Sequence, residues 1–139
     1  MKRFVVDATV TLSWFVDRPA SSYAERVKQE LLHGAHAVVP ALWHAEMANG
    51  LMVAERRRVL TALDVSGCLR DLEVLLVHAI ETSSVLTTMR QALTVARAFQ
   101  LSAYDALYLD TARVEELSLA TLDLALRAAA PRAGVELFV

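Results

Sequence analysis

Short apolar runs alternate along this chain with longer segments in which apolar residues recur every three or four positions. The short runs are typical of buried strands, and the three-to-four spacing is typical of amphipathic helices. Strands that alternate with helices form parallel sheets whose two faces are both covered. We therefore predict an α/β fold with three layers, α/β/α, around a central, mostly parallel sheet of about five strands.

The predicted elements cover the whole chain. Strands are predicted at residues 3–6, 37–39, 74–80, 117–121 and 135–139. A short helix is predicted after Asp7, with Leu12, Phe15 and Val16 as its apolar positions. Further helices are predicted over residues 20–32, 41–57, 63–72, 85–96, 102–116 and 124–130, the last of them ended by Pro131. No repeat, low-complexity segment or linker interrupts this pattern, and 139 residues is a usual domain size. We predict one domain, residues 1–139.

Composition excludes several classes of protein. An apolar fraction of 55% with 22% charged residues is the opposite of a disordered chain. The net charge of −2 disfavours a general nucleic-acid coat, so nucleic acid would need a local basic patch or a bridging metal. Cys68 is the only cysteine, which fits a reducing compartment. With no secretory signal and no apolar stretch long enough to span a bilayer, we expect a cytoplasmic protein and no membrane partner.

Acidic residues stand at positions where α/β proteins bind ligands. Asp7 and Asp123 each follow a predicted strand, and Asp105 lies in the first turn of a predicted helix. Ligands collect beyond the carboxyl ends of parallel strands. Each aspartate could instead simply cap a helix, and taken singly that alternative is the commoner one. Glu46 lies inside an otherwise apolar helix, so it is either on a thin solvated face or held by a partner.

Taken together, the four acids indicate a metal site. Carboxylates crowded at one edge repel one another unless protons or cations intervene. Hard cations such as Mg²⁺ prefer oxygen ligands, and the chain has no thiol cluster that would favour zinc. Such ions lower the pKa of a bound water and stabilise charge on a phosphoryl group. The acids therefore favour Mg²⁺ or Mn²⁺ and phosphodiester chemistry.

Four stretches, in order, resemble the motifs of PIN-domain nucleases. They are Val5–Val10 followed by Trp14 and Phe15, Val39–Trp43 followed by Glu46–Leu51, Leu101–Leu109, and Leu119–Asp123 followed by Leu126 and Ala129. Their order and spacing are similar to that family over essentially the whole chain. Length and the lack of further domains look most like the VapC-type toxins of toxin–antitoxin pairs.

This resemblance assigns roles to seven residues. It implies that Asp7, Glu46, Asp105 and Asp123 are the catalytic, metal-binding acids, and that Thr9, Asn49 and Thr121 are supporting polar groups. Thr9 stands where the family often has serine, and it retains the hydroxyl. Asp110, five residues after Asp105, should point away from that side chain and face solvent.

The resemblance implies a metal-dependent endoribonuclease, the toxin of a type II toxin–antitoxin system, with RNA as substrate, Mg²⁺ or Mn²⁺ as cofactor, and a cognate antitoxin and a second copy of the chain as partners. The alternative is a catalytically silent binding module of the same fold, which the four intact acids disfavour. A response-type α/β domain is disfavoured because no suitable lysine lies near a late strand. The mean hydropathy of +0.38 predicts an exposed apolar surface for protein partners.

Overall fold

Four strands form one parallel sheet in the computed structural model, which describes residues 1–139. They are β1 (Arg3–Val6), β2 (His36–Val39), β3 (Ile80–Thr82) and β4 (Ser118–Ala120), in the order β3-β2-β1-β4. Val5 of β1 is opposite Val38 of β2 and Leu119 of β4. The first strand of the chain is therefore central, and its carboxyl end is flanked by those of β2 and β4.

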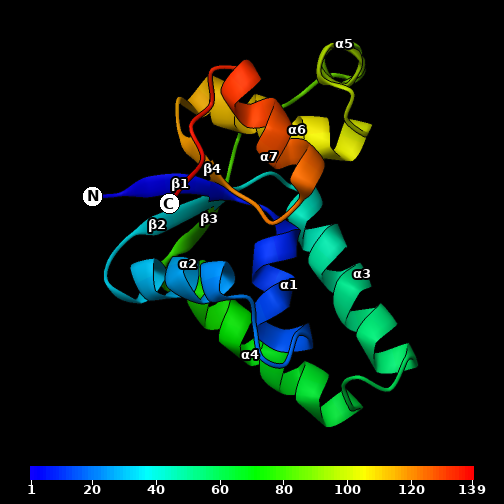
Figure 1. Ribbon diagram of the computed structural model, residues 1–139. Helices are drawn as coiled ribbons and strands as arrows, with labels where there is room; N and C mark the ends of the chain where they lie inside the picture. Colours follow the sequence, from blue (N-terminus) through cyan, green and yellow to red (C-terminus); the bar gives the residue numbers. More distant parts are fainter.

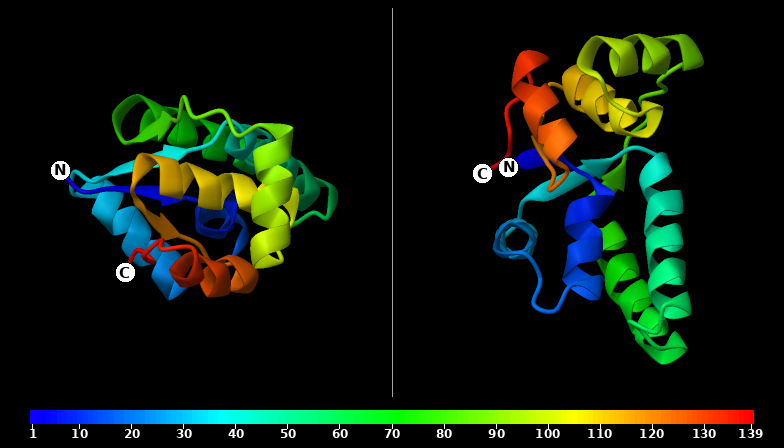
Figure 2. Two further views of the ribbon diagram at one scale, coloured as in Figure 1. Left: turned by 90° about the horizontal axis from the view of Figure 1, so that it is seen from above. Right: turned by 45° about the vertical axis from the view of Figure 1, so that its right-hand side comes forward.

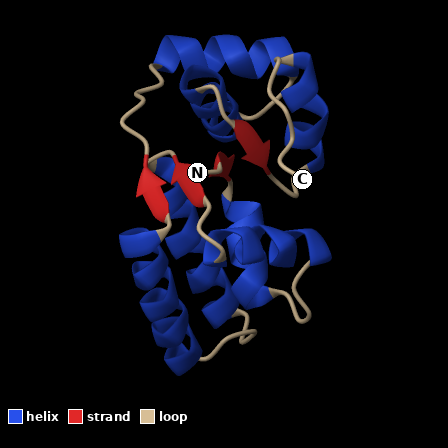
Figure 3. Cartoon of the chain, turned by 90° about the vertical axis from the view of Figure 1, so that its left-hand side faces the viewer, coloured by secondary structure: helices blue, strands red, loops and turns tan.

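Helices cover both faces of this sheet and confirm the three-layer α/β/α prediction (Figure 1). On one side lie α1 (Ala8–Val16), α2 (Ser22–Leu32), α3 (Leu42–Arg56) and α4 (Ala62–His78), and on the other α5 (Met89–Phe99), α6 (Ala103–Glu115) and α7 (Leu124–Arg132). Figure 2 and Figure 3 show the strands between these two sets of helices. None of the helices combines the length and the apolar character that a membrane crossing requires.

The central strand is buried on both faces, as expected for a covered parallel sheet. Phe4, Val5 and Val6 are 0% exposed and belong to one continuous cluster of buried apolar side chains. Helix α3 approaches α1 closely at Gly50, where an added Cβ would lie 2.5 Å from Leu12 Cδ1. Glycine at this position therefore lets the helix that carries Glu46 pack tightly on the helix that follows Asp7.

The predicted strand at residues 74–80 is wrong, because most of it is helical. Helix α4 begins with a capping box between Thr61 and Asp64 and continues to His78, and β3 starts only at Ile80. Val74 and Val77 are 59% and 77% exposed, so this apolar run is not a buried strand. Helix α4 buries Cys68 and Leu72, one turn apart, and that helical spacing determines the local structure.

Other predicted boundaries also differ from the structure, most of them by one or two residues. The strand predicted at residues 135–139 is reduced to one parallel bridge between Leu119 and Leu137, held by hydrogen bonds of Leu119 with the Glu136 carbonyl and the Phe138 N–H. Helix α5 begins at Met89 rather than at residue 85, since Thr88 and Gln91 form its capping box. Helix α7 continues past Pro131 to Arg132. The sheet therefore has four strands rather than about five.

Candidate active site

Asp7 is a buried carboxylate at the carboxyl end of the central strand. It is 2% exposed, and it is the N-cap of α1. Its Oδ1 accepts hydrogen bonds from Thr9 Oγ1 at 2.5 Å and from the Val10 N–H at 3.3 Å. Its Oδ2 accepts from Thr121 Oγ1 at 2.5 Å. Asp7 therefore caps a helix and at the same time links the ends of β1 and β4.

The surroundings of Asp7 favour its neutral form. Burial raises the pKa of this carboxyl from 3.8 to about 6, and the hydrogen bonds from Thr121, Thr9 and Val10 oppose that shift. The negative charge of Asp105 raises the pKa further. A cation at this edge of the sheet would relieve the cost of ionising Asp7.

The turn after β4 is joined to the turn after β1 by two threonines. Thr121, which is fully buried, accepts a hydrogen bond from the Asp123 N–H at 2.9 Å while it donates to Asp7. Thr9 Oγ1 accepts from the Leu122 N–H at 3.0 Å. Asp123 Oδ2 in turn caps α7 by accepting from the Leu126 N–H at 2.9 Å. The two strand-end turns thus hold each other in a fixed relation.

Asp105 contributes a third carboxylate from the start of α6. Its N–H donates to Ser102 Oγ at 3.1 Å, but its side chain accepts nothing from the Ser102 backbone, so the capping box that the sequence resembles is only half formed. Burial raises the pKa of Asp105, and the charges of Asp123 and Glu46 raise it further. The Asp105 carboxylate therefore lies within electrostatic reach of the other three acids.

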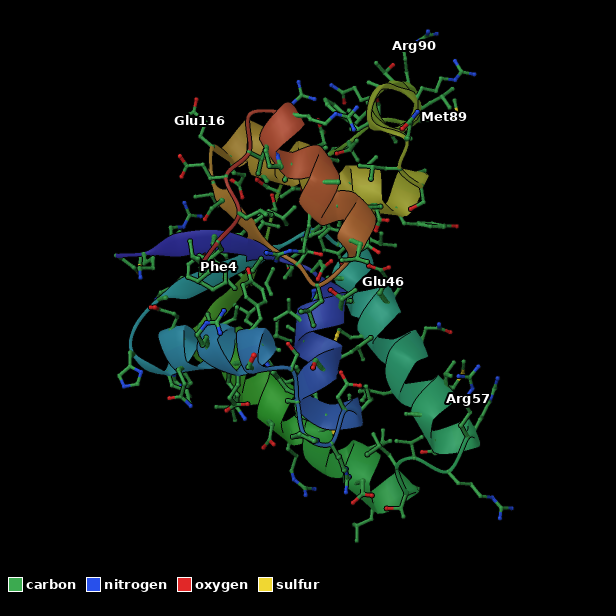
Figure 4. The ribbon with its side chains drawn as sticks, viewed as in Figure 1. Phe4, Glu46, Arg57, Met89, Arg90 and Glu116 are labelled. Atoms are coloured by element: carbon green, nitrogen blue, oxygen red, sulfur yellow. The ribbon has the colours of Figure 1, made fainter.

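Glu46 reaches the same edge from the upper end of α3 (Figure 4). Its Oε1 accepts a hydrogen bond from Tyr108 Oη at 2.5 Å, so this partly buried carboxylate is held by a partner. Burial and the bond to Glu46 raise the pKa of Tyr108 well above its usual range, and the phenol keeps its proton. The sequence patterns did not single out Tyr108, because nothing local relates it to Glu46.

A pocket of about 350 Å³ opens beside Glu46, between α1 and α3. Thr9, Asn49 and Tyr104 supply its other polar groups, and Asn49 is exposed on its wall. Two of the three supporting groups expected from the resemblance, Thr9 and Thr121, thus contact Asp7 directly, whereas Asn49 only lines this pocket.

The expectation for Asp110 was wrong. Asp110 is 8% exposed, and its Oδ2 accepts a hydrogen bond from Thr87 Oγ1 at 2.7 Å. Helix α5 and the segment that precedes it pack along α6 and cover this side chain. Asp110 therefore fastens that segment to α6 rather than facing solvent.

The chemistry of the four acids fits a hard divalent cation. All the available metal ligands are carboxylate oxygens, which Mg²⁺ and Mn²⁺ prefer. The carboxylates repel one another, and a cation would neutralise that repulsion. No three His, Cys, Asp or Glu side chains are grouped so that one ion could contact all of them. Mg²⁺ ordinarily uses one or two protein carboxylates and retains several waters, so it does not require such a group.

Comparison with known proteins identifies the family. The family model described as the PIN domain matches residues 4–131. No curated protein matches the chain.

Three solved structures are similar over nearly the whole chain. PAE2754 from Pyrobaculum aerophilum has a TM-score of 0.70 at 21% identity, with 92% of this chain and 84% of that chain covered. FitAcB from Neisseria gonorrhoeae has a TM-score of 0.67 at 19% identity, with 98% and 96% covered. A domain of a functionally unknown protein from Methanocaldococcus jannaschii has a TM-score of 0.56 at 18% identity, with 99% and 90% covered. At these identities the likeness concerns the fold.

Proposed function

This chain belongs to the PIN domain family, and from that premise we propose that it is a metal-dependent endoribonuclease, the toxin of a type II toxin–antitoxin pair. PIN domains are generally nucleases, and PIN nucleases generally use divalent metal ions. Cleavage of RNA, the VapC-type assignment and the choice of Mg²⁺ or Mn²⁺ are the parts that we propose for this chain.

One observation carries the proposal. Asp7, Glu46, Asp105 and Asp123 come from four separate elements. Burial raises the pKa of Asp7 and of Asp105, and the charges of neighbouring acids raise both further. Helix capping alone does not require four carboxylates at one edge of a sheet, and Glu46 and Asp105 cap no helix through their side chains. We propose that these four acids hold the ion, one or two of them directly and the others through its bound waters, and that they are the catalytic residues.

Each part of this edge has a role in the proposed reaction. A bound Mg²⁺ or Mn²⁺ would lower the pKa of a water and balance negative charge on the phosphodiester. Thr9 and Thr121 hold the Asp7 carboxylate in one orientation, with a hydroxyl on each oxygen. The pocket wall formed by Asn49 and Tyr104 offers polar groups to an RNA strand beside the acids. Without a cation, the acids would repel the phosphate backbone.

A cognate antitoxin and a second copy of the chain are proposed as protein partners. Large apolar side chains are exposed on α4 and around the start of α5: Leu63, Leu69, Val74, Val77, Leu86, Met89 and Leu93. Exposed apolar surface of this kind marks interaction sites. An arginine of the antitoxin would suit the acidic edge, because its guanidinium pairs with carboxylates in a bidentate manner. A catalytically silent binding module is the alternative, and it is disfavoured because all four acids are present.

The proposal is tested by RNA cleavage with the purified chain. We expect Mg²⁺ or Mn²⁺ to support cleavage and EDTA to stop it. Asp105→Asn should reduce the rate by more than about 100-fold, because even outer-shell changes at metal sites cost 10–100-fold. Asp71→Asn, on the exposed side of α4, is the matched control and should cleave normally. Cleavage that persists in EDTA, or that is unchanged in Asp105→Asn, would contradict a metal-dependent ribonuclease.

A further inference from the structure

Tyr108 joins the two helical layers of the molecule at the carboxyl edge of the sheet. It lies on α6, on one side of the sheet, and its hydroxyl donates to Glu46 Oε1 on α3, on the other side (Figure 1). The residue is 1% exposed and is one of the largest buried side chains in the chain. The bond connects residues 62 positions apart in the sequence, so it forms only when both layers are in place.

The hydroxyl of Tyr108 and the carboxylate of Glu46 are each other's only side-chain hydrogen-bond partners. The Ala8 backbone N–H also lies close to the Tyr108 hydroxyl. A buried hydroxyl without a partner is costly, whereas phenylalanine would fill the same apolar space at no such cost. Hydrogen bonds to an ionised carboxylate are among the strongest in proteins, so this one restricts a flexible glutamate to a single orientation.

The other tyrosine of α6 shows that this contact is particular to Tyr108. Tyr104, one turn earlier, is 63% exposed and forms no side-chain hydrogen bond. Glu46 accepts the Tyr108 hydrogen bond with Oε1, and its Oε2 has no protein partner. The Glu46 side chain is therefore oriented by one oxygen and free to ligate with the other.

We propose that Tyr108 is a positioning residue that holds the Glu46 carboxylate by Oε1 so that Oε2 binds the divalent cation. This inference rests on the proposed function, because it requires the ion to be held at the acidic edge. Outer-shell hydrogen bonds orient ligands in this way at metal sites and affect metal affinity without touching the ion.

The test measures Mn²⁺ affinity of the metal-free chain by calorimetric titration, without RNA. Tyr108→Phe removes only the hydroxyl and should weaken Mn²⁺ binding by about tenfold. In a Glu46→Ala background the same substitution should change the affinity by less than about twofold, because its effect passes through Glu46. Tyr23→Phe is the matched control: it removes a tyrosine hydroxyl that donates to the Phe138 carbonyl, and it should leave Mn²⁺ affinity unchanged.

Each outcome is decisive. A lower melting temperature with unchanged Mn²⁺ affinity would make Tyr108 purely structural and overturn the inference, as would equal losses of affinity in both backgrounds. If the unaltered chain binds no Mn²⁺, both the proposed function and the inference fail. If the unaltered chain and Tyr108→Phe bind Mn²⁺ with the same affinity, only the inference is overturned.

A second measurement applies if Tyr108→Phe does not fold. A variant carrying Tyr23→Phe and Tyr104→Phe keeps Tyr108 as its only tyrosine. Mg²⁺ should then shift the near-ultraviolet absorption of this tyrosine, because ligation draws charge from the carboxylate that accepts its hydrogen bond. The shift should be absent when Glu46→Ala is added. An absorption spectrum that Mg²⁺ leaves unchanged would overturn the inference.

Discussion

The turns after β1 and β4 are built from the same parts, yet they hold their aspartates differently. In each turn an aspartate is the N-cap of the helix that follows, Asp7 through the Val10 N–H and Asp123 through the Leu126 N–H. Asp7 is buried and accepts two threonine hydroxyls as well, whereas Asp123 is partly exposed and accepts only its helix N–H. One aspartate can therefore cap a helix and also belong to a polar site. The two aspartates differ in burial.

The largest expected difference between Asp7 and Asp123 is in how each makes the stability of the fold depend on pH. The folded chain raises the pKa of Asp7 from 3.8 to about 6, so it binds this proton more tightly than the unfolded chain. The associated stability is fully present below about pH 4 and is lost as the pH rises through about 6. In metal-free buffer, ionised Asp7 should cost about 3 kcal/mol at neutral pH, which is the difference between the unfolded and folded pKa values converted to free energy.

Asp7→Asn should remove most of that dependence. Because asparagine stays neutral, we expect the variant to be more stable than the unaltered chain by about 1–3 kcal/mol near pH 8 and similar to it near pH 4. Urea unfolding at a series of pH values, in the presence of EDTA, measures this difference. Parallel stability curves for the two chains would show that Asp7 does not carry the shift.

The second largest effect on stability is expected at Thr121, whose hydroxyl bonds to both turns. Thr121→Val leaves Asp7 Oδ2 and the Asp123 N–H without a partner, which should lower the free energy of unfolding by about 2 kcal/mol. It should also raise the pKa of Asp7 above about 6, since the lost hydrogen bond lowers that pKa. Nuclear magnetic resonance titration of the Asp7 carboxyl measures the pKa shift.

Thr87→Val is the matched control for this experiment. It also breaks a threonine–aspartate hydrogen bond, the one to Asp110, and should lower stability. The pKa of Asp7 should stay where it is. An equal shift of the Asp7 pKa in both variants would mean that loosening of the fold, rather than loss of the Thr121 hydroxyl, is responsible.

The smallest effect is expected at Asp123. Asparagine caps helices about as well as aspartate, so Asp123→Asn should change stability by no more than about 0.5 kcal/mol, against about 1 kcal/mol for Asp123→Ala. Removal of this charge should lower the pKa of Asp105, which the charge of Asp123 raises. Urea midpoints for the two variants measure the difference. A loss by Asp123→Asn as large as that by Asp123→Ala would show that the charge, not the cap, stabilises α7.

Local pattern was enough to predict most of the fold. The strands at residues 3–6 and 37–39 were predicted to within one residue, because short buried runs bounded by polar residues are distinctive. The error at residues 74–80 arose because four consecutive apolar residues suit a buried strand and one side of a helix equally well. Only the packing of α4 through Cys68 and Leu72 decides between them, and that packing depends on distant residues.

The sequence predicted some residues of the candidate site and missed others. The strand-end positions of Asp7 and Asp123 follow from the rule for parallel sheets, and the resemblance to PIN nucleases supplied Thr9 and Thr121. Metal binding by the four acids stays a prediction. Asp110 could not be placed from the sequence because its burial is produced by the segment around Thr87, and Tyr108 was missed because its partner is 62 residues away.

The central place of β1 in the sheet determines the order in which the site can be assembled during synthesis. The ribosome makes Asp7 first, and Thr121, which donates to it, is made 114 residues later. Until residues 118–120 emerge, β1 has a neighbour on one side only, and the edge of the sheet lacks both Thr121 and Asp123. Domains generally complete their folding as units once the whole sequence is available. A nascent chain therefore carries an incomplete acidic edge until Thr121 and Asp123 have emerged from the ribosome.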